Sequence, residues 1–340
     1  MYSEAELDAA VRAGVLPAQT AAAFREFVAR GHAAPGVDEE HFRLLTGFND
    51  IFVTIAAALI LMAIAWLGGR QAVWLGGALV AAASWGLAEY FTRKRRMGLP
   101  SILLLLSFVG ACIATVGGVV LPQRHGIGPQ GLPALLGAVC VATGAAAAFV
   151  HWRRFMVPIT VAAGAASALG AGVLLLASAF PDSQDLPRVL TFVAGICMFG
   201  LAMWWDASDR QRITRRADVA FWLHLAAAPM IVHPAFGLLG LLGHGTPAAA
   251  AAVAAVGIYV ALAAVALAVD RRALLVSALA YVLVALSALL NGPGAISTGL
   301  PVAALLIGSC LLLLSALWQR IRRVTVLALP AGLQLSLPPV

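Results

Sequence analysis

Residues 51–96 are IFVTIAAALILMAIAWLGGRQAVWLGGALVAAASWGLAEYFTRKRR. Two apolar blocks, at about 51–69 and 71–91, are separated by Arg70 and are followed by the basic cluster 93–96. Each block has the length of roughly 20 residues that an α-helix needs to cross the hydrocarbon of a bilayer. The stretch predicts two consecutive transmembrane helices.

The same pattern continues along the rest of the chain. Of 340 residues, 62% are hydrophobic and 11% are charged, against roughly 25% charged in an ordinary soluble domain. A water-soluble fold could not bury that much apolar surface. Eight further apolar blocks lie at about 99–121, 132–150, 156–179, 188–205, 218–241, 248–269, 273–290 and 299–318. The sequence therefore predicts an all-α polytopic transmembrane helix bundle of ten helices in a lipid bilayer.

The distribution of basic residues supports this number of helices. The formal charge is +7, but the basic residues form short clusters between apolar blocks and no long basic face, so we expect no nucleic-acid partner. In a ten-helix arrangement Arg70, Arg124 and Arg188 fall on one side of the membrane, and the other 19 of the 22 Lys and Arg fall on the opposite side. By the positive-inside rule, both termini are predicted to be cytoplasmic.

The segment before the first apolar block is the one sizeable polar region. Ser3 and Glu6 have the spacing of a capping box, Gly14 interrupts the apolar pattern, and Pro17 suits the first turn of a second helix. A helical hairpin of this size is too small to be stable alone, so it should dock on the membrane face, on its own loops or on a protein partner. We predict a hairpin segment at 1–48, a transmembrane domain at 49–320 and a cytoplasmic or interfacial tail at 321–340.

Arg-Arg pairs recur at the predicted cytoplasmic ends. They begin at 95, 153, 215, 271 and 322, at intervals of 58, 62, 56 and 51 residues. One interpretation is five tandem two-helix hairpins inserted in the same orientation. The alternative is that positive-inside selection alone makes the pairs recur, and the sequence leaves both open.

Small residues recur at intervals of four in two of the predicted helices. The two stripes are Gly110, Ala114 and Gly118, and Gly164, Ala168 and Gly172. Such stripes let membrane helices approach closely. The alternative role is to line a passage.

Acidic and amide side chains at helix ends are candidate functional residues. Asn49 and Asp50 open the first helix, where they suit capping and the helix dipole, or a ligand or partner contact. Glu89 is the most deeply placed acid, and Arg93 follows four residues later. This spacing indicates an interfacial salt bridge, with a functional role for Glu89 as the alternative. Asn291, after the ninth helix, completes this group.

Two histidines lie in the seventh predicted helix. His224 and His233 are nine residues apart, which places them on opposite faces of a regular helix, so they would share a metal only if Pro229 distorted it strongly. Each histidine therefore either hydrogen-bonds a neighbouring helix or serves singly in a proton relay.

The sequence contains no signal for a cofactor or a metal. Its four cysteines all lie inside apolar blocks without a metal or redox spacing, and no phosphate loop, zinc motif, nucleophile elbow or dinucleotide fingerprint occurs in a suitable context. No Asp, Glu, Lys or Arg lies at the centre of a predicted helix, which argues against an ion-driven pump. We expect no cofactor.

The N-terminal region resembles a known family. The hairpin around Gly14-Val15-Leu16, the segment Asp38-Glu39-Glu40-His41-Phe42-Arg43-Leu44-Leu45-Thr46-Gly47-Phe48-Asn49-Asp50-Ile51-Phe52 and the Ala/Leu/Gly-rich remainder resemble a domain-of-unknown-function family of bacterial multi-pass membrane proteins. The resemblance is specific over residues 1 to about 60 and compositional beyond. It implies a bacterial inner-membrane protein and brings no catalytic residues.

Three functions remain, in order of preference. A permease or carrier for a small or apolar molecule requires a cavity at mid-depth lined by Asn, Ser, Thr or His. An interaction or sensing protein predicts a closely packed bundle without a polar cavity, and a hairpin whose apolar face stays exposed. A membrane enzyme would need Glu89, His224 or His151 to converge at one cytoplasmic pocket.

Overall fold

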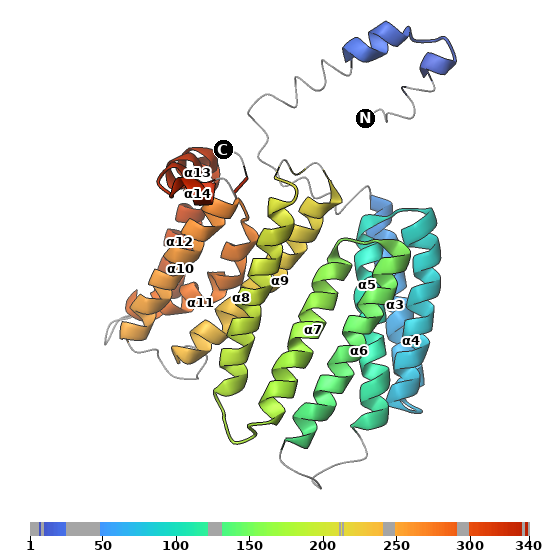
Figure 1. The fold of residues 1–340 in the computed structure, drawn as a ribbon, viewed down its shortest axis with the longest axis horizontal. Helices are drawn as coiled ribbons and strands as arrows, with labels where there is room; N and C mark the ends of the chain where they lie inside the picture. Colours follow the sequence, from blue (N-terminus) through green and yellow to red (C-terminus); the bar gives the residue numbers. More distant parts are fainter. Residues whose placement is uncertain are drawn as a thin grey trace. The chain divides into compact units, whose positions relative to one another are not determined.

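The computed structural model describes residues 7, 10–24, 48–121, 131–210, 212, 214–240, 249–290, 299–334 and 337–338 (Figure 1). These residues form helices and connecting turns, with no strand among them. The chain divides into two compact units, Met1–Phe42 and Arg43–Val340. The predicted all-α helix bundle is confirmed.

The first unit contains the turn of the predicted helical hairpin. Gly14 has a φ of +70°, a left-handed conformation that glycine adopts readily. The backbone N–H of Val15 donates to the carbonyl of Ala10 at 3.0 Å, which closes the end of the first helix. Pro17 then precedes helical residues 18–24. The break at Gly14 and the restart after Pro17 are both confirmed.

Part of the predicted hairpin cannot be compared with the structure. The following residues of the predicted pattern lie outside the described ones: Ser3, Glu6, Val28 and Gly31. Among those described, Ala21 is buried and Phe24 is 46% exposed. An apolar side chain of this unit is therefore left uncovered.

Ten helices of the second unit follow the ten predicted spans in order. They are α3 (Phe48–Gly69), α4 (Val73–Ala88), α5 (Gly98–Val120), α6 (Leu132–Phe155), α7 (Ile159–Ser178), α8 (Leu186–Ala207), α9 (Arg215–Leu238), α10 (Ala249–Val269), α11 (Ala273–Leu290) and α12 (Gly299–Ala316). Eight of the described helices are long and apolar enough to cross a membrane. The other two are α4, with 16 residues, and α11, whose apolar stretch is Leu274–Leu290. The protein is therefore a multi-pass membrane protein.

Several ends differ from the predicted ones. The second span was expected at 71–91, but α4 stops at Ala88 and continues as a π-helix, η1 (Glu89–Lys94). The last span was expected to reach 318, but it breaks at Leu317, where α13 (Trp318–Leu327) begins. The expected boundary between residues 320 and 321 thus falls inside α13, because the apolar stretch gives way to an amphipathic helix before the arginines. A short α14 (Ala331–Gln334) follows.

The arginine clusters all lie at one end of the bundle, the upper end in Figure 1, which we call the arginine-rich end. Each of the four turns that join α4–η1 to α5, α6 to α7, α8 to α9 and α10 to α11 at this end contains one non-glycine residue with a φ between 52° and 59°. These residues are Arg96, Met156, Arg212 and Asp270, at intervals of 60, 56 and 58.

The helices joined by these turns form the most extensive pairs of the bundle: α4 with α5, α6 with α7, α8 with α9, and α10 with α11. The recurrence of one backbone conformation supports the predicted repeat of two-helix units. The predicted two-helix unit began after each Arg pair. In the structure, the two helices of each extensive pair are joined by the turn at an Arg pair.

Glycines set the close packing of α3, α4 and α5. A Cβ atom on Gly77 of α4 would lie 2.8 Å from the backbone nitrogen of Thr115 in α5, and one on Gly118 would lie 2.5 Å from that of Trp74. The packing role predicted for Gly118 is confirmed. A Cβ on Gly110, from the same stripe, would meet no atom within 4 Å, so this glycine faces open space.

Candidate functional site

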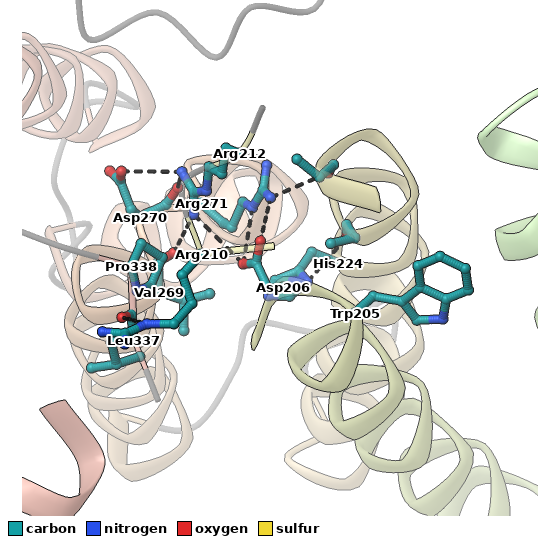
Figure 2. Close-up of polar contacts among 12 residues, drawn as sticks. Trp205, Asp206, Arg210, Arg212, His224, Val269, Asp270, Arg271, Leu337 and Pro338 are labelled. Carbon is teal, nitrogen blue, oxygen red and sulfur yellow. Dashed lines mark hydrogen bonds and ion pairs between the residues drawn. The ribbon is translucent and has the colours of Figure 1, made fainter. Parts of the chain in front are cut away.

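Among the described residues, the most heavily charged buried cluster lies at the arginine-rich end, where the end of α8 meets the α10–α11 turn (Figure 2). Arg271 donates from Nη2 to Asp206 Oδ1 at 2.7 Å, and the two side chains are 4% and 2% exposed. Arg271 also donates to the carbonyl of Ala217 at 3.3 Å, and Arg212 approaches Asp206 at 3.5 Å. The Asp206 carboxylate thus has two guanidinium groups around it, which is how a buried charge becomes tolerable.

Asp270, in the α10–α11 turn, joins two other segments to this cluster. Its Oδ2 accepts from Arg212 Nη1 at 3.1 Å, and its Oδ1 accepts from the indole N–H of Trp318 at 2.7 Å. Arg322 approaches Oδ1 at 3.7 Å and is 2% exposed. Arg212 also donates to the carbonyl of Val269 at 2.8 Å. One carboxylate therefore connects the α8–α9 turn to the α10–α11 turn and to α13.

The chain after α14 returns to the same cluster. Arg322 donates to the carbonyl of Pro338 at 2.8 Å, and Arg210 donates to the carbonyl of Leu337 at 3.1 Å. The tail, predicted to be cytoplasmic or interfacial, is thus held by arginines on the α8–α9 turn and on α13. We refer to Asp206, Arg212, Asp270, Arg271 and Arg322 as the arginine–aspartate network.

The network fixes the relative positions of helix ends. Its two carboxylates are each paired with arginines, which stay protonated at all physiological pH values. A carboxylate with two guanidinium partners is costly to separate from them in a low-dielectric setting. We infer that the network is a structural clamp on α8, α9, α10, α11 and α13.

Sequence reasoning missed the network because it treated its arginines only as markers of membrane topology. Asp206 and Asp270 lie next to predicted helix ends, where acids are unremarkable. One signal was available: each of the two acids lies within six residues of an arginine cluster.

Glu89 is paired, as its spacing to Arg93 predicted. Arg93 Nη1 donates to Glu89 Oε2 at 3.2 Å. Arg154 of α6 makes a stronger, bidentate contact, with Nε to Oε1 at 2.6 Å and Nη2 to Oε2 at 3.0 Å. Glu89 lies in η1, beyond the apolar part of α4. The hydrogen bond from Arg154 lowers the pKa of its carboxyl. Arg154 was not foreseen, because α6 extends to Phe155 rather than ending near 150.

Asn49 and Asp50 lie in the first turn of α3, which begins at Phe48. Asn49 is exposed and Asp50 is 3% exposed. The position of Asp50 agrees with a favourable interaction between a carboxylate and the helix dipole. Asn291 lies outside the described residues.

His224 and His233 lie apart on α9, as their spacing predicted. His224 is fully buried, and its Nδ1 is 3.1 Å from the carbonyl of Ala220 in its own helix. His233 is exposed, and its Nδ1 is 2.6 Å from the hydroxyl of Tyr281 in α11. A bond to a neighbouring helix was predicted for both and is found for His233. Among the described residues, no group of three or more His, Cys, Asp or Glu is placed to hold a metal ion.

An apolar groove runs between α3, α4 and α5, with a volume of about 570 Å³. Its lining residues are Ala58, Leu61, Met62, Ala65, Gly69, Val73, Gly76, Gly77, Val80, Leu103, Leu106, Ser107, Gly110, Ala111 and Ala114. Two members of the first small-residue stripe, Gly110 and Ala114, therefore line a groove, the alternative role considered for them. The hydroxyl of Ser107 is the one polar side chain among these residues. The groove therefore meets only in part the Asn, Ser, Thr or His lining that was predicted for a permease or carrier.

A second, narrower cleft of about 120 Å³ lies between α11 and α12 near the arginine-rich end. Arg272, Ser315 and Trp318 border it together with five aliphatic side chains. Neither Glu89 nor the histidines His151 and His224 line either cavity. The convergence of these residues that an enzyme would need is therefore not seen in the two cavities.

Comparisons with known proteins leave the family open. No family model, no curated protein and no solved structure matches the chain. The resemblance to a bacterial domain-of-unknown-function family stays a prediction.

Proposed function

We propose that the protein is a permease or carrier for a small apolar molecule, which it takes from the bilayer at the groove between α3, α4 and α5. The volume of the groove carries this proposal: about 570 Å³ lies within the roughly 300–1,000 Å³ of typical small-molecule sites. Its aliphatic and glycine lining suits a hydrocarbon chain. A polar solute would leave its hydrogen-bonding groups unpaired there.

The position of the groove indicates which part of the bilayer supplies the molecule. Its lining covers the second half of α3, from Ala58 to Gly69, and the first half of α4, from Val73 to Val80. It therefore runs from mid-bundle to the end opposite the arginine-rich end. The exposed Arg70 and Gln71 form the turn beside Gly69. A molecule with one apolar chain and a small polar end fits this arrangement.

The test uses a photoactivatable long-chain alcohol with the protein reconstituted in phospholipid vesicles. Gly110→Leu fills the groove without a backbone clash, because a Cβ there meets no atom within 4 Å. Gly257→Leu, on α10, has the same open surroundings but lies outside the groove and serves as the matched control. We expect labelling of α3–α5 peptides to fall in Gly110→Leu and to persist in Gly257→Leu.

Binding and transport are separated by a second measurement on the same vesicles. Movement of a fluorescent single-chain amphiphile between leaflets should exceed that in protein-free vesicles and should be lost in Gly110→Leu. Equal labelling in both glycine variants would contradict binding at the groove. Normal labelling without faster movement would contradict carriage.

A second function, an interaction protein anchored by its bundle, is favoured by one observation. In the first unit Val15 is 77% exposed and Phe24 is 46% exposed, as expected for a hairpin that docks a protein partner. Deleting residues 1–42 tests whether carriage needs the first unit. Amphiphile movement that survives this deletion assigns carriage to the bundle, while its loss would make the hairpin part of the carrier.

A further inference from the structure

We propose that the cleft between α11 and α12 binds an anionic phospholipid from the leaflet that borders the arginine-rich end, with one acyl chain between the helices and the phosphate on Arg272. This site is separate from the groove of α3–α5, and the proposal does not depend on carriage.

The interior of the cleft suits a hydrocarbon chain. Its walls are Leu275, Val276 and Leu279 on α11, and Leu311 and Leu314 on α12. The side chains that line the cleft are themselves partly uncovered. Val276 is 68% exposed, and Ser315 is also exposed. In a bilayer these exposed side chains contact lipid, so an acyl chain reaches the cleft directly.

The polar groups of the cleft lie together at its end near the α10–α11 turn. The guanidinium carbon of Arg272 is 4.9 Å from the centre of the Trp318 ring, a cation–π contact that holds the guanidinium at the mouth of the cleft. The Ser315 hydroxyl borders the same cleft. A guanidinium group can donate two parallel hydrogen bonds to one phosphate, and a hydroxyl can add a third.

The outer surface of α13 provides a second, independent indication of an anionic membrane surface. Arg320 and Arg323 are exposed, and on the same side of the helix Val324 is 70% and Leu327 is 65% exposed. α13 does not continue the axis of α12 but lies across the arginine-rich end (Figure 1). The exposed arginines can contact anionic headgroups, and the exposed aliphatic side chains beside them can contact the acyl chains just below.

The buried face of α13 explains why the cleft has a fixed shape. Trp318, which borders the cleft, donates its indole N–H to Asp270 of the arginine–aspartate network. Arg322, one turn later, approaches the same carboxylate and donates to the carbonyl of Pro338. The network therefore holds one wall of the cleft in place before lipid binds, which reduces the conformational entropy lost on binding.

The experiment measures lipid retention by native mass spectrometry of the full chain. The protein is titrated with short-chain phosphatidylglycerol or with phosphatidylcholine of the same chain length. We expect phosphatidylglycerol to be retained preferentially, and Arg272→Gln to weaken its binding about tenfold, because one charge-assisted contact to phosphate is lost. Ser315→Phe, which blocks the cleft without changing charge, should weaken it similarly.

The matched control is Arg95→Gln, which removes one positive charge from the exposed turn between η1 and α5. Among the described residues, the contacts found for the Arg95 side chain are with Tyr90. Equal weakening in Arg95→Gln and Arg272→Gln would overturn the site in favour of a general charge effect. Competition by soluble glycerol phosphate as strong as by the lipid would overturn the role of the acyl chain. Equal retention of both lipids would overturn the role of the phosphate charge.

Discussion

The buried pair Asp206–Arg271 provides the most direct test of the clamp. The substitution Arg271→Met keeps an apolar stem of similar length and removes the guanidinium group that donates to Asp206 at 2.7 Å. Asp206 is 2% exposed, so water cannot replace the lost partner. Removing one member of a buried ion pair lowers stability by about 3–5 kcal/mol.

The surroundings of Asp206 place the expected value within that range. Arg212 remains 3.5 Å away from the carboxylate, so the charge keeps one partner, and we expect the lower end, a loss of about 3 kcal/mol. In the double variant Asp206→Leu/Arg271→Met no buried carboxylate is left at this position. The double variant should therefore lose less stability than Arg271→Met alone.

Reversible unfolding in mixed lipid–detergent micelles, titrated with dodecyl sulfate and followed by circular dichroism, measures these changes. The control is Arg188→Met, which breaks the pair with Asp185 at 2.8 Å, where the two side chains are 54% and 70% exposed. This surface pair should contribute less than about 1 kcal/mol. If Arg271→Met cost no more than Arg188→Met, the reasoning from burial would be refuted.

Three further predictions concern other contacts. Gly77→Ala should lower the free energy of unfolding by about 1–3 kcal/mol, because the new Cβ would lie 2.8 Å from the Thr115 nitrogen. The same titration should show no loss for Gly86→Ala, because a Cβ there meets no atom within 4 Å. Trp318→Phe removes the indole donor to Asp270, so hydrogen exchange should become faster in α13 and stay unchanged in α3. Because Arg154 lowers the pKa of Glu89, this pair should stabilise the fold above the ordinary carboxyl pKa and lose its effect as the pH falls through the lowered value. Glu89→Gln should flatten the acid limb of a stability–pH curve, and an unchanged curve would contradict the role of the pair.

Hydropathy and charge were sufficient to predict the spans, because both are properties of consecutive residues. The block at 51–69 became α3, and the broad order of ten helices follows from the same criterion. The boundaries were less accurate where the chain leaves the α-helical pattern. At Glu89 a π-helix continues beyond α4, and at Leu317 the chain turns into α13.

The arginine–aspartate network could not be predicted, because its partners are far apart in sequence. Asp206 and Arg271 are 65 residues apart, and Arg212 and Asp270 are 58 apart. The position of an arginine relative to a predicted helix end says which side of the membrane it occupies and not which carboxylate it meets. By contrast, the Glu89–Arg93 contact was predictable, since four residues make one helical turn.

The groove between α3, α4 and α5 was also beyond sequence reasoning. Its shape depends on two glycines. Gly77 in α4 lets that helix pack closely against α5, whereas a Cβ on Gly110 in α5 would meet no atom within 4 Å. Both are glycines in apolar helices, and their different surroundings arise only when three helices are packed together.

The left-handed residues in the turns have a consequence for protein engineering. Glycine adopts this conformation readily, whereas other L-residues are disfavoured there by roughly 1–2 kcal/mol. Arg96 and Arg212 therefore retain charges that belong to the predicted orientation signal, at the expense of local backbone stability. Met156, with no charge and a side chain that is 52% exposed, has no such role. Position 156 is thus where glycine should strengthen the fold while leaving the orientation signal intact.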